Sequence, residues 1–218
     1  MTPPAGEGRP TADSEYTDRL RRLGGKRWKR VLDVQAPYRW NVRRLHLGRT
    51  LDVGCGLGRN LAHLGGHGVG VDHNAESVAV ARRQGLEAYT VEEFGRSAHA
   101  VPGAFDSLLV AHVVEHMSGA DALDLLRSYV PYLTAAGRIC FITPQESGYR
   151  TDATHVRFVD LAGLADLAGA VGFEVRRQFS FPLPRPFGRV FRYNEFVLIA
   201  ARPAPRAAPA GAEPPASR

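Results

Sequence analysis

The sequence has 218 residues, 44% of them hydrophobic, and a formal net charge of +6. This length suffices for one compact domain with a buried core and excludes a second large domain. No apolar run approaches the roughly 20 residues of a membrane-spanning helix, and the first residues lack the apolar core and cleavage site of a secretory signal. We therefore expect a cytoplasmic protein without a membrane span.

The two ends of the sequence differ in composition from its middle. Residues 1–18 and 202–218 are poor in core-forming side chains, and we expect disordered tails there. Between Arg19 and Arg49 there are 11 Lys or Arg and one acid, with apolar residues at helical spacing, so residues 19–48 are predicted to be a basic helical segment. Its charge could attract an anionic substrate or a nucleic acid, but a solvated helix face laid over the domain is the favoured interpretation.

Residues 49–201 alternate between strand and helix patterns, which predicts an α/β fold with a mostly parallel sheet and helices on both faces. A short gap before the last strand predicts that it pairs antiparallel with its predecessor. Helices are expected over 60–64, 74–83, from 119 to near Gly137, and 161–171. Strands are expected over 49–54, 68–72, 86–91, 105–111, 138–143, 173–181 and 194–202.

The stretch "LDVGCGLGRN" (51–60) places glycines at alternate positions after a strand-like lead-in. Glycine permits tight turns and lets a ligand approach the main chain. A dinucleotide fingerprint reads G-x-G-x-x-G, whereas the third glycine here, Gly58, comes one residue early and Arg59 follows it. Asp52 beside the loop would repel a pyrophosphate and attract an ammonium group. The loop is therefore expected to bind a cationic group and no phosphate.

The same stretch is similar to motif I, D/E-x-G-x-G-x-G, of the class I S-adenosylmethionine-dependent methyltransferases. "GVGVDHN" (68–74) resembles the second-strand motif of that family, and "FDSLLVAHVVEHM" (105–117) resembles the fourth-strand motif of its type 11 branch. "LTAAGRICFITP" (133–144) resembles the fifth-strand region. The resemblance implies a Rossmann-like, seven-stranded, mostly parallel sheet with an antiparallel final strand, and S-adenosylmethionine as the cofactor.

The resemblance also implies positions for the cofactor. Asp72 stands where the family places the acid that binds the ribose diol. Thr90 replaces the usual Asp after the third strand, so adenine recognition is assigned instead to the Val91 backbone and Glu92. The implied cofactor site comprises Asp52, Gly54, Cys55, Gly56, Gly58, Asp72, His73, Val91, Glu92 and His112.

Histidines that follow the fourth and fifth strands are the candidate bases, because histidine titrates near working pH. His155 in "THVRF" and His112 are the candidate catalytic residues; His155 could instead clamp its loop together with Arg157, and His112 could line the methionine end of the cofactor. Glu115 is a candidate supporting partner, and His116 is expected to cap a turn.

Metal and cysteine chemistry are not expected. The histidines show no paired ligand spacing such as H-E-x-x-H, so no metal site is predicted. Two cysteines form neither a disulfide framework nor a zinc cluster. A nucleophilic role for Cys55 is possible, but a small residue filling a tight turn is the favoured interpretation.

The function implied by the resemblance is methyl transfer to an oxygen or nitrogen of a small-molecule acceptor. Transfer to RNA or another polyanion is an alternative; the absence of an aromatic base-stacking platform disfavours nucleic acid. A nicotinamide-dependent oxidoreductase and a catalytically silent cofactor-binding protein are further alternatives, and the glycine spacing and Asp52 argue against the oxidoreductase.

Overall fold

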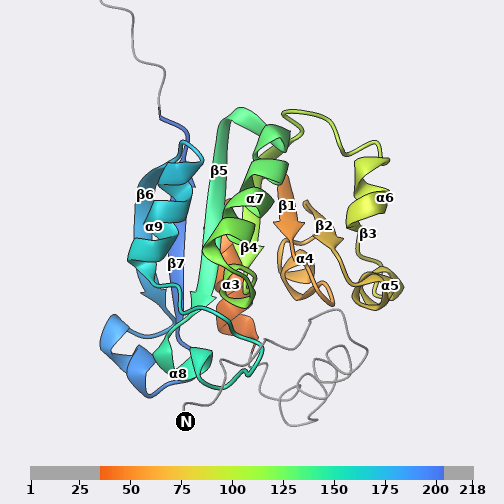
Figure 1. Cartoon of the computed structure of the whole chain (residues 1–218). Coiled ribbons are helices and arrows are strands. Elements are labelled where there is room, and N and C mark those ends of the chain that lie inside the picture. Colours follow the sequence, from red (N-terminus) through yellow and green to blue (C-terminus); the bar gives the residue numbers. More distant parts are fainter. Residues whose placement is uncertain (1–34, 204–218) are drawn as a thin grey trace, which may run out of the picture.

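The computed structural model describes residues 35–203 (Figure 1). The predicted tails, apart from Arg202 and Pro203, and most of the predicted basic segment lie outside these residues. The described part of that segment forms helix α3, Ala36–Arg44, with a proline in its first turn. None of the described helices is both long enough and apolar enough to cross a membrane.

A seven-stranded sheet organises the domain, in the order β3-β2-β1-β4-β5-β7-β6. β7 pairs antiparallel with both of its neighbours, and the remaining pairs are parallel. This confirms the predicted mostly parallel sheet with an antiparallel final strand. The strands are β1 Thr50–Val53, β2 Gly68–Asp72, β3 Ala88–Thr90, β4 Phe105–Ala111, β5 Leu133–Pro144, β6 Glu174–Phe181 and β7 Glu195–Ala201.

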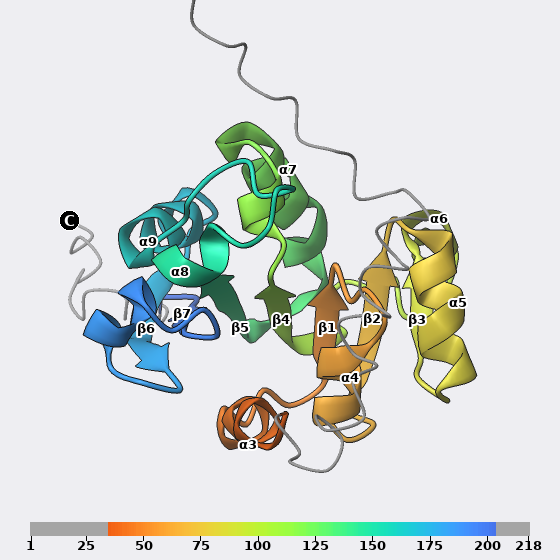
Figure 2. The ribbon, with the colours of Figure 1, turned by 90° about the horizontal axis from the view of Figure 1, so that it is seen from below.

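Helices cover both faces of the sheet, as predicted. Seen along the strands, α3 and α4 lie on one face and α7 and α9 on the other, while α5 and α6 lie toward the β3 edge (Figure 2). The helices that follow α3 are α4 Arg59–His63, α5 Ala75–Arg83, α6 Val91–Gly95, α7 Gly119–Tyr129, α8 Glu146–Tyr149 and α9 Leu161–Ala170; short 3-10 turns span Val114–His116, Val130–Tyr132 and Arg185–Arg189.

Local sequence signals explain where several helices begin. The side chain of Asn74 accepts a hydrogen bond from Ser77 N and caps α5, and Ser118 caps α7 in the same way through Asp121 N. Such caps satisfy backbone N–H groups that have no partner within the helix. Both helix starts were therefore predictable from one residue each.

Three of the predicted elements have boundaries that differ from the prediction. β5 begins at Leu133 rather than at residue 138, and α7 ends at Tyr129 because Pro131 follows in a 3-10 turn and lacks a backbone N–H. The expected strand at 86–91 is shorter, since Thr90 and Glu93 form a capping box that starts α6 at Val91. Propensity alone favoured a longer strand there.

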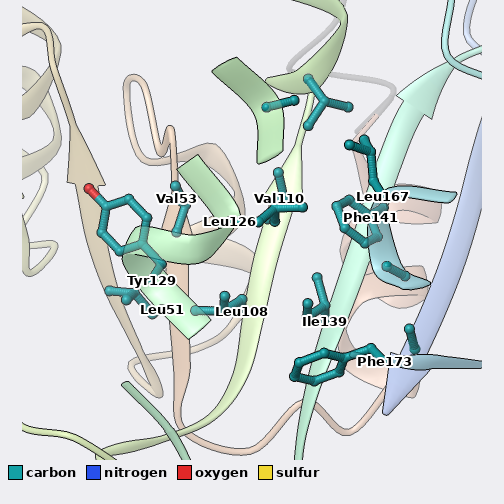
Figure 3. Packing of buried hydrophobic residues seen from close by; sticks show 14 of the residues in the cluster. Leu51, Val53, Leu108, Val110, Leu126, Tyr129, Ile139, Phe141, Leu167 and Phe173 are labelled. Carbon is teal, nitrogen blue, oxygen red and sulfur yellow. The ribbon is translucent and has the colours of Figure 1, made fainter. Parts of the chain in front are cut away.

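Two apolar layers sandwich the central strands. Leu108 and Val110 of β4 face α7 and α9 and belong to one cluster with Leu126 of α7 and with Phe141 of the neighbouring strand β5 (Figure 3). Leu109 of β4 faces the opposite layer. Because β4 is buried on both sides, its continuous apolar sequence is explained. The rigid centre of the sheet thereby fixes the ends of β1 and β4, where polar side chains gather.

Candidate functional site

The glycine loop follows β1 at the carboxyl edge of the sheet, and its three glycines have different surroundings. All three adopt positive φ, namely 74°, 53° and 83° for Gly54, Gly56 and Gly58. A Cβ on Gly54 would lie 2.5 Å from Val113 Cγ2, and one on Gly58 would lie 2.4 Å from Leu86 Cδ1. A Cβ on Gly56 would meet nothing within 4 Å. Protein atoms therefore explain the outer two glycines, while Gly56 leaves room for a ligand.

Asp52 lies in β1, two residues before Gly54. It is buried, with 1% of its surface exposed. Neither of its carboxylate oxygens has a hydrogen-bond partner among the described residues. Burial, helped by the charge of Asp72 and opposed by Arg59, raises the pKa of Asp52 to about 7. A buried carboxylate without a partner is costly, so a cationic ligand above it would relieve an existing penalty.

Asp72 ends β2 and ties the loop to the sheet. Its Oδ2 accepts a hydrogen bond from Gly56 N at 2.8 Å, and its Oδ1 accepts one from Asn74 N at 2.8 Å. His73 Nδ1 lies 3.5 Å from Oδ1. An ionised carboxylate can accept about four hydrogen bonds, so Asp72 retains acceptor capacity for a ribose diol.

The predicted adenine contacts lie at the end of β3. Val91 is an exposed apolar residue, and the carboxylate of Glu92 pairs with Arg96. The hydroxyl of Thr90, which occupies the family's Asp position, accepts a hydrogen bond from Glu93 N as the cap of α6. The Thr90 side chain thus serves the helix.

His112 follows β4 and joins two carboxylates. Its φ is 59°, a conformation rare for residues other than glycine. Its Nε2 lies 3.0 Å from Glu195 Oε1 and its Nδ1 lies 3.4 Å from Glu115 Oε1. Burial alone would lower the pKa of His112, but the two glutamates outweigh it and raise the pKa to about 9. The imidazole therefore bridges the two acids as a cation near neutral pH.

A pocket lies beside His112, between the α3 face and the carboxyl end of β4. It combines polar side chains from α3 and α4 with Glu195, the first residue of β7. The lining residues are Tyr38, Asn41, Val42, Arg59, Asn60, Ala111, His112, Ile142 and Glu195. Burial raises the pKa of the Tyr38 phenol, which donates a hydrogen bond to Tyr193 O at 2.7 Å.

Sequence reasoning missed Tyr38 and Glu195. Glu195 is an acid at the start of an otherwise apolar strand, and an antiparallel strand begins at the edge where its parallel neighbours end. That pattern could have placed Glu195 beside His112. Tyr38 lies in the basic segment, and no pattern in that segment indicated which face it would turn toward the site.

The structure separates the other candidate base, His155, from the lining of this pocket. His155 Nδ1 donates a hydrogen bond to Tyr149 O at 2.6 Å, and its ring lies 4.8 Å from that of His116, centroid to centroid. His116 Nδ1 contacts Thr154 O at 3.2 Å, so it ties the turn after β4 to the loop after β5. Glu115, His116 and His155 form a cluster that sequence spacing did not reveal.

Cys55 has its side chain in the core rather than at the loop surface. It packs with Leu61, Val78 and Ala88, and burial raises the pKa of its thiol. A Cβ on Gly70 would lie 2.7 Å from its Sγ. These contacts favour the interpretation of Cys55 as a small residue in a tight turn.

The seven-stranded sheet with an antiparallel β7 and a glycine loop after β1 has the class I methyltransferase fold. Residues 51–141 match the methyltransferase domain family, type 11. This match covers the glycine loop and strands β1 to β4, and the order of the seven strands is that of the class I S-adenosylmethionine-dependent methyltransferase fold.

Relatives agree with this assignment. The ubiquinone biosynthesis O-methyltransferase of Sodalis glossinidius (strain morsitans) is 34% identical over 102 residues, which is 43% of this chain and 40% of that protein. The chain therefore spans less than half of the length of that relative.

Two solved structures share the fold. Magnesium protoporphyrin IX methyltransferase from Synechocystis PCC 6803, with bound SAH, has a TM-score of 0.62 and 16% identity, over 88% of this chain and 97% of that one. The Burkholderia thailandensis 1,6-didemethyltoxoflavin-N1-methyltransferase has a TM-score of 0.56 and 20% identity, over 93% of each chain.

Proposed function

We propose that this chain transfers the methyl group of S-adenosylmethionine to an oxygen or nitrogen of a small molecule. The observation that carries the proposal is the open space at Gly56, in the loop that follows Asp52, whose buried carboxylate has no hydrogen-bond partner among the residues that the structure describes. A ligand that fits must approach the backbone closely and bring a positive charge. The methionine part of S-adenosylmethionine supplies an ammonium group, and its sulfonium makes the methyl group reactive.

The residues of the chain would hold this cofactor along the carboxyl edge. Asp52 would attract the ammonium group, the glycine loop would pack against the main part of the ligand, and Asp72 would accept hydrogen bonds from the ribose. The Val91 backbone and Glu92 would contact adenine. These groups lie at the carboxyl ends of β1, β2 and β3 or directly after them, the place where open α/β sheets bind ligands.

The same charges argue against a nicotinamide dinucleotide. Its pyrophosphate would have to lie at the glycine loop, beside Asp52 and Asp72. Two carboxylates there disfavour two phosphate charges, and the structure shows Asp72 already bonded to Gly56 N, the kind of backbone donor that a phosphate would need.

The acceptor is proposed to bind in the pocket beside His112. Tyr38 and Glu195 provide a hydroxyl and a carboxylate, and the imidazole of His112 lies between Glu115 and Glu195. Fixed polar groups of this kind orient a small acceptor for in-line attack, which is the main contribution a protein makes to methyl transfer. His112 is thus the proposed contact of the acceptor, held in place by the two glutamates.

The names of the relatives support a small-molecule acceptor, since they include an O-methyltransferase of ubiquinone biosynthesis and a toxoflavin N1-methyltransferase. Both cysteines are buried and unpaired, which is usual in a reducing compartment and supports the cytoplasm as the place of action.

Incubation of the purified chain with S-adenosylmethionine carrying a labelled methyl group, a metabolite extract and, separately, transfer RNA tests the proposal. We expect label in a small organic product. Label in the RNA alone would reject the small-molecule acceptor, and label in neither, with cofactor bound, would favour a silent cofactor-binding protein.

A further inference from the structure

Three side chains of types that bind metals form a cluster near His112: Glu115, His116 and His155. Glu115 is the member that contacts His112 and so adjoins the proposed acceptor pocket. Glu115 and His116 belong to the 3-10 turn after β4, and His155 comes from the loop after β5. One donor atom from each of the three lies within 4.8 Å of the others. Fold topology therefore brings His155 close to two residues that precede it by 39 and 40 positions in the sequence.

The buried member of the cluster is the carboxylate of Glu115. Its exposed fraction is 0%, and neither oxygen accepts a hydrogen bond from any described residue. Its backbone carbonyl is used, by Val156 N and Arg157 N, so the residue itself is firmly held. The charged neighbour of its side chain is His112, at 3.4 Å. The imidazolium of His112 balances the charge at Oε1, while Oε2 is buried, has no partner among the described residues and is left for a metal ion.

The hydrogen bonds of the two histidines fix which ring nitrogen is free. A carbonyl oxygen can only accept, so the contacts with Thr154 O and Tyr149 O require a proton on Nδ1 of His116 and of His155. In the neutral rings the Nε2 lone pairs then remain available. Metal-binding histidines usually donate their other N–H to a carbonyl or carboxylate in this manner.

We propose that Glu115, His116 and His155 bind one divalent transition-metal ion, with Zn²⁺ as the best match. Two imidazole nitrogens and one carboxylate form a ligand set that is common in zinc sites with an open coordination position. Ligands of a tetrahedral zinc ion at about 2.0–2.1 Å lie roughly 3.4 Å apart. The cluster must therefore contract by somewhat more than 1 Å, and His155, on a partly exposed loop, is the residue placed to move.

This site would bind its ion whether or not the chain transfers methyl groups. The test uses the tag-free full chain, treated with chelator, dialysed against ZnCl₂ and then against metal-free buffer. We expect about one zinc per chain by elemental analysis, and an increase in Tm on adding ZnCl₂. His155→Ala should weaken zinc affinity more than tenfold and remove the increase in Tm.

The matched control is His67→Ala, which removes an exposed histidine from the loop between α4 and β2. It should retain the zinc stoichiometry and the Tm increase of the unmodified chain. Glu115→Gln tests the buried ligand, and His155→Ala keeps the test valid if that variant fails to fold. Absence of stoichiometric zinc in the unmodified chain, or equal zinc binding by His155→Ala and His67→Ala, would overturn the proposal.

Discussion

Asp72 holds the glycine loop through a 2.8 Å hydrogen bond in which Gly56 N donates to Oδ2. This contact joins the end of β2 to the turn after β1, and it places the proposed ribose acceptor next to the glycine that leaves space for the ligand. The two residues therefore act together, because the Asp72 carboxylate holds the glycine loop in the conformation that is proposed to bind the cofactor.

Replacement Asp72→Ala removes both the loop contact and the ribose acceptor. We expect S-adenosylhomocysteine affinity to fall by at least tenfold, since hydrogen bonds to a charged group contribute about 1.5–3 kcal/mol. Titration calorimetry measures this change. Asp124→Ala, at an exposed position on α7, is the control and should bind as the unmodified chain does. Equal affinities for the two variants would show that Asp72 does not contact the cofactor.

Gly56→Ala tests whether the open space at the glycine loop binds the cofactor. Gly103→Ala is the control, because Gly103 has a similar backbone conformation. Gly56 and Gly103 both have positive φ, 53° and 74°, and a Cβ on either would meet no atom within 4 Å. Each Ala variant should lose a similar stability, about 1 kcal/mol. Only Gly56→Ala should lose S-adenosylhomocysteine binding, and a comparable loss in Gly103→Ala would contradict the proposed position of the ligand.

The pKa of Asp52, about 7, makes cofactor affinity depend on pH. The ammonium group of the ligand favours the ionised carboxylate, and below pH 7 the proton on Asp52 must leave before that pair forms. We expect S-adenosylhomocysteine affinity to rise by nearly tenfold per unit up to about pH 7 and then to level off. Calorimetry across this range should show no such rise in Asp52→Asn; an unchanged slope would locate the titrating group elsewhere.

The stability of the cofactor-free chain should respond to the same group with the opposite sign. The folded pKa of Asp52 lies above its unfolded value, near 3.9, so the folded chain retains a proton that the unfolded chain has lost. Stability therefore decreases as pH rises from about 4 to about 7. Asp52→Asn should unfold at a higher temperature than the unmodified chain at pH 8 and lose this advantage at pH 4. A lower Tm at pH 8 would contradict the burial of an unpartnered charge.

His112→Ala tests the proposed acceptor contact, once an acceptor has been found. We expect kcat/KM to fall by 10²-fold or more, which is the loss of rate that a misplaced reacting group causes. The affinity for S-adenosylhomocysteine should change by less than threefold. His99→Ala, at a half-buried position where His99 contacts Glu87, is the control. If cofactor affinity falls as far as kcat/KM, His112 belongs to the methionine end of the cofactor site instead.

The sequence allowed most of the sheet to be predicted, because β1, β2 and β4 are short apolar runs followed by glycine or polar turns. The exact run of β4, Phe105–Ala111, agrees with the prediction. β5 was harder: Ala135, Ala136 and Gly137 are small residues typical of a turn, yet they continue the strand, since β5 pairs with β4 on both sides of them, at Leu133 and again from Arg138. Tertiary pairing overrides local propensity at such positions.

The site was only partly predictable for the same reason. The glycine motif contains Asp52 and Gly56, and the motif of the next strand contains Asp72, so local spacing was enough to predict these three positions. The Glu115–His116–His155 cluster depends on where the loop after β5 returns, and no local pattern encodes that. Glu195 depends on the direction of β7.

The central claim is that the loop around Gly56 binds S-adenosylmethionine rather than a nicotinamide dinucleotide. Titration calorimetry of the unmodified chain with S-adenosylhomocysteine and with NAD tests it most directly. The account predicts one-site binding of S-adenosylhomocysteine that Gly56→Ala abolishes, and no measurable binding of NAD. Tighter binding of NAD, or S-adenosylhomocysteine binding that Gly56→Ala leaves intact, would contradict it.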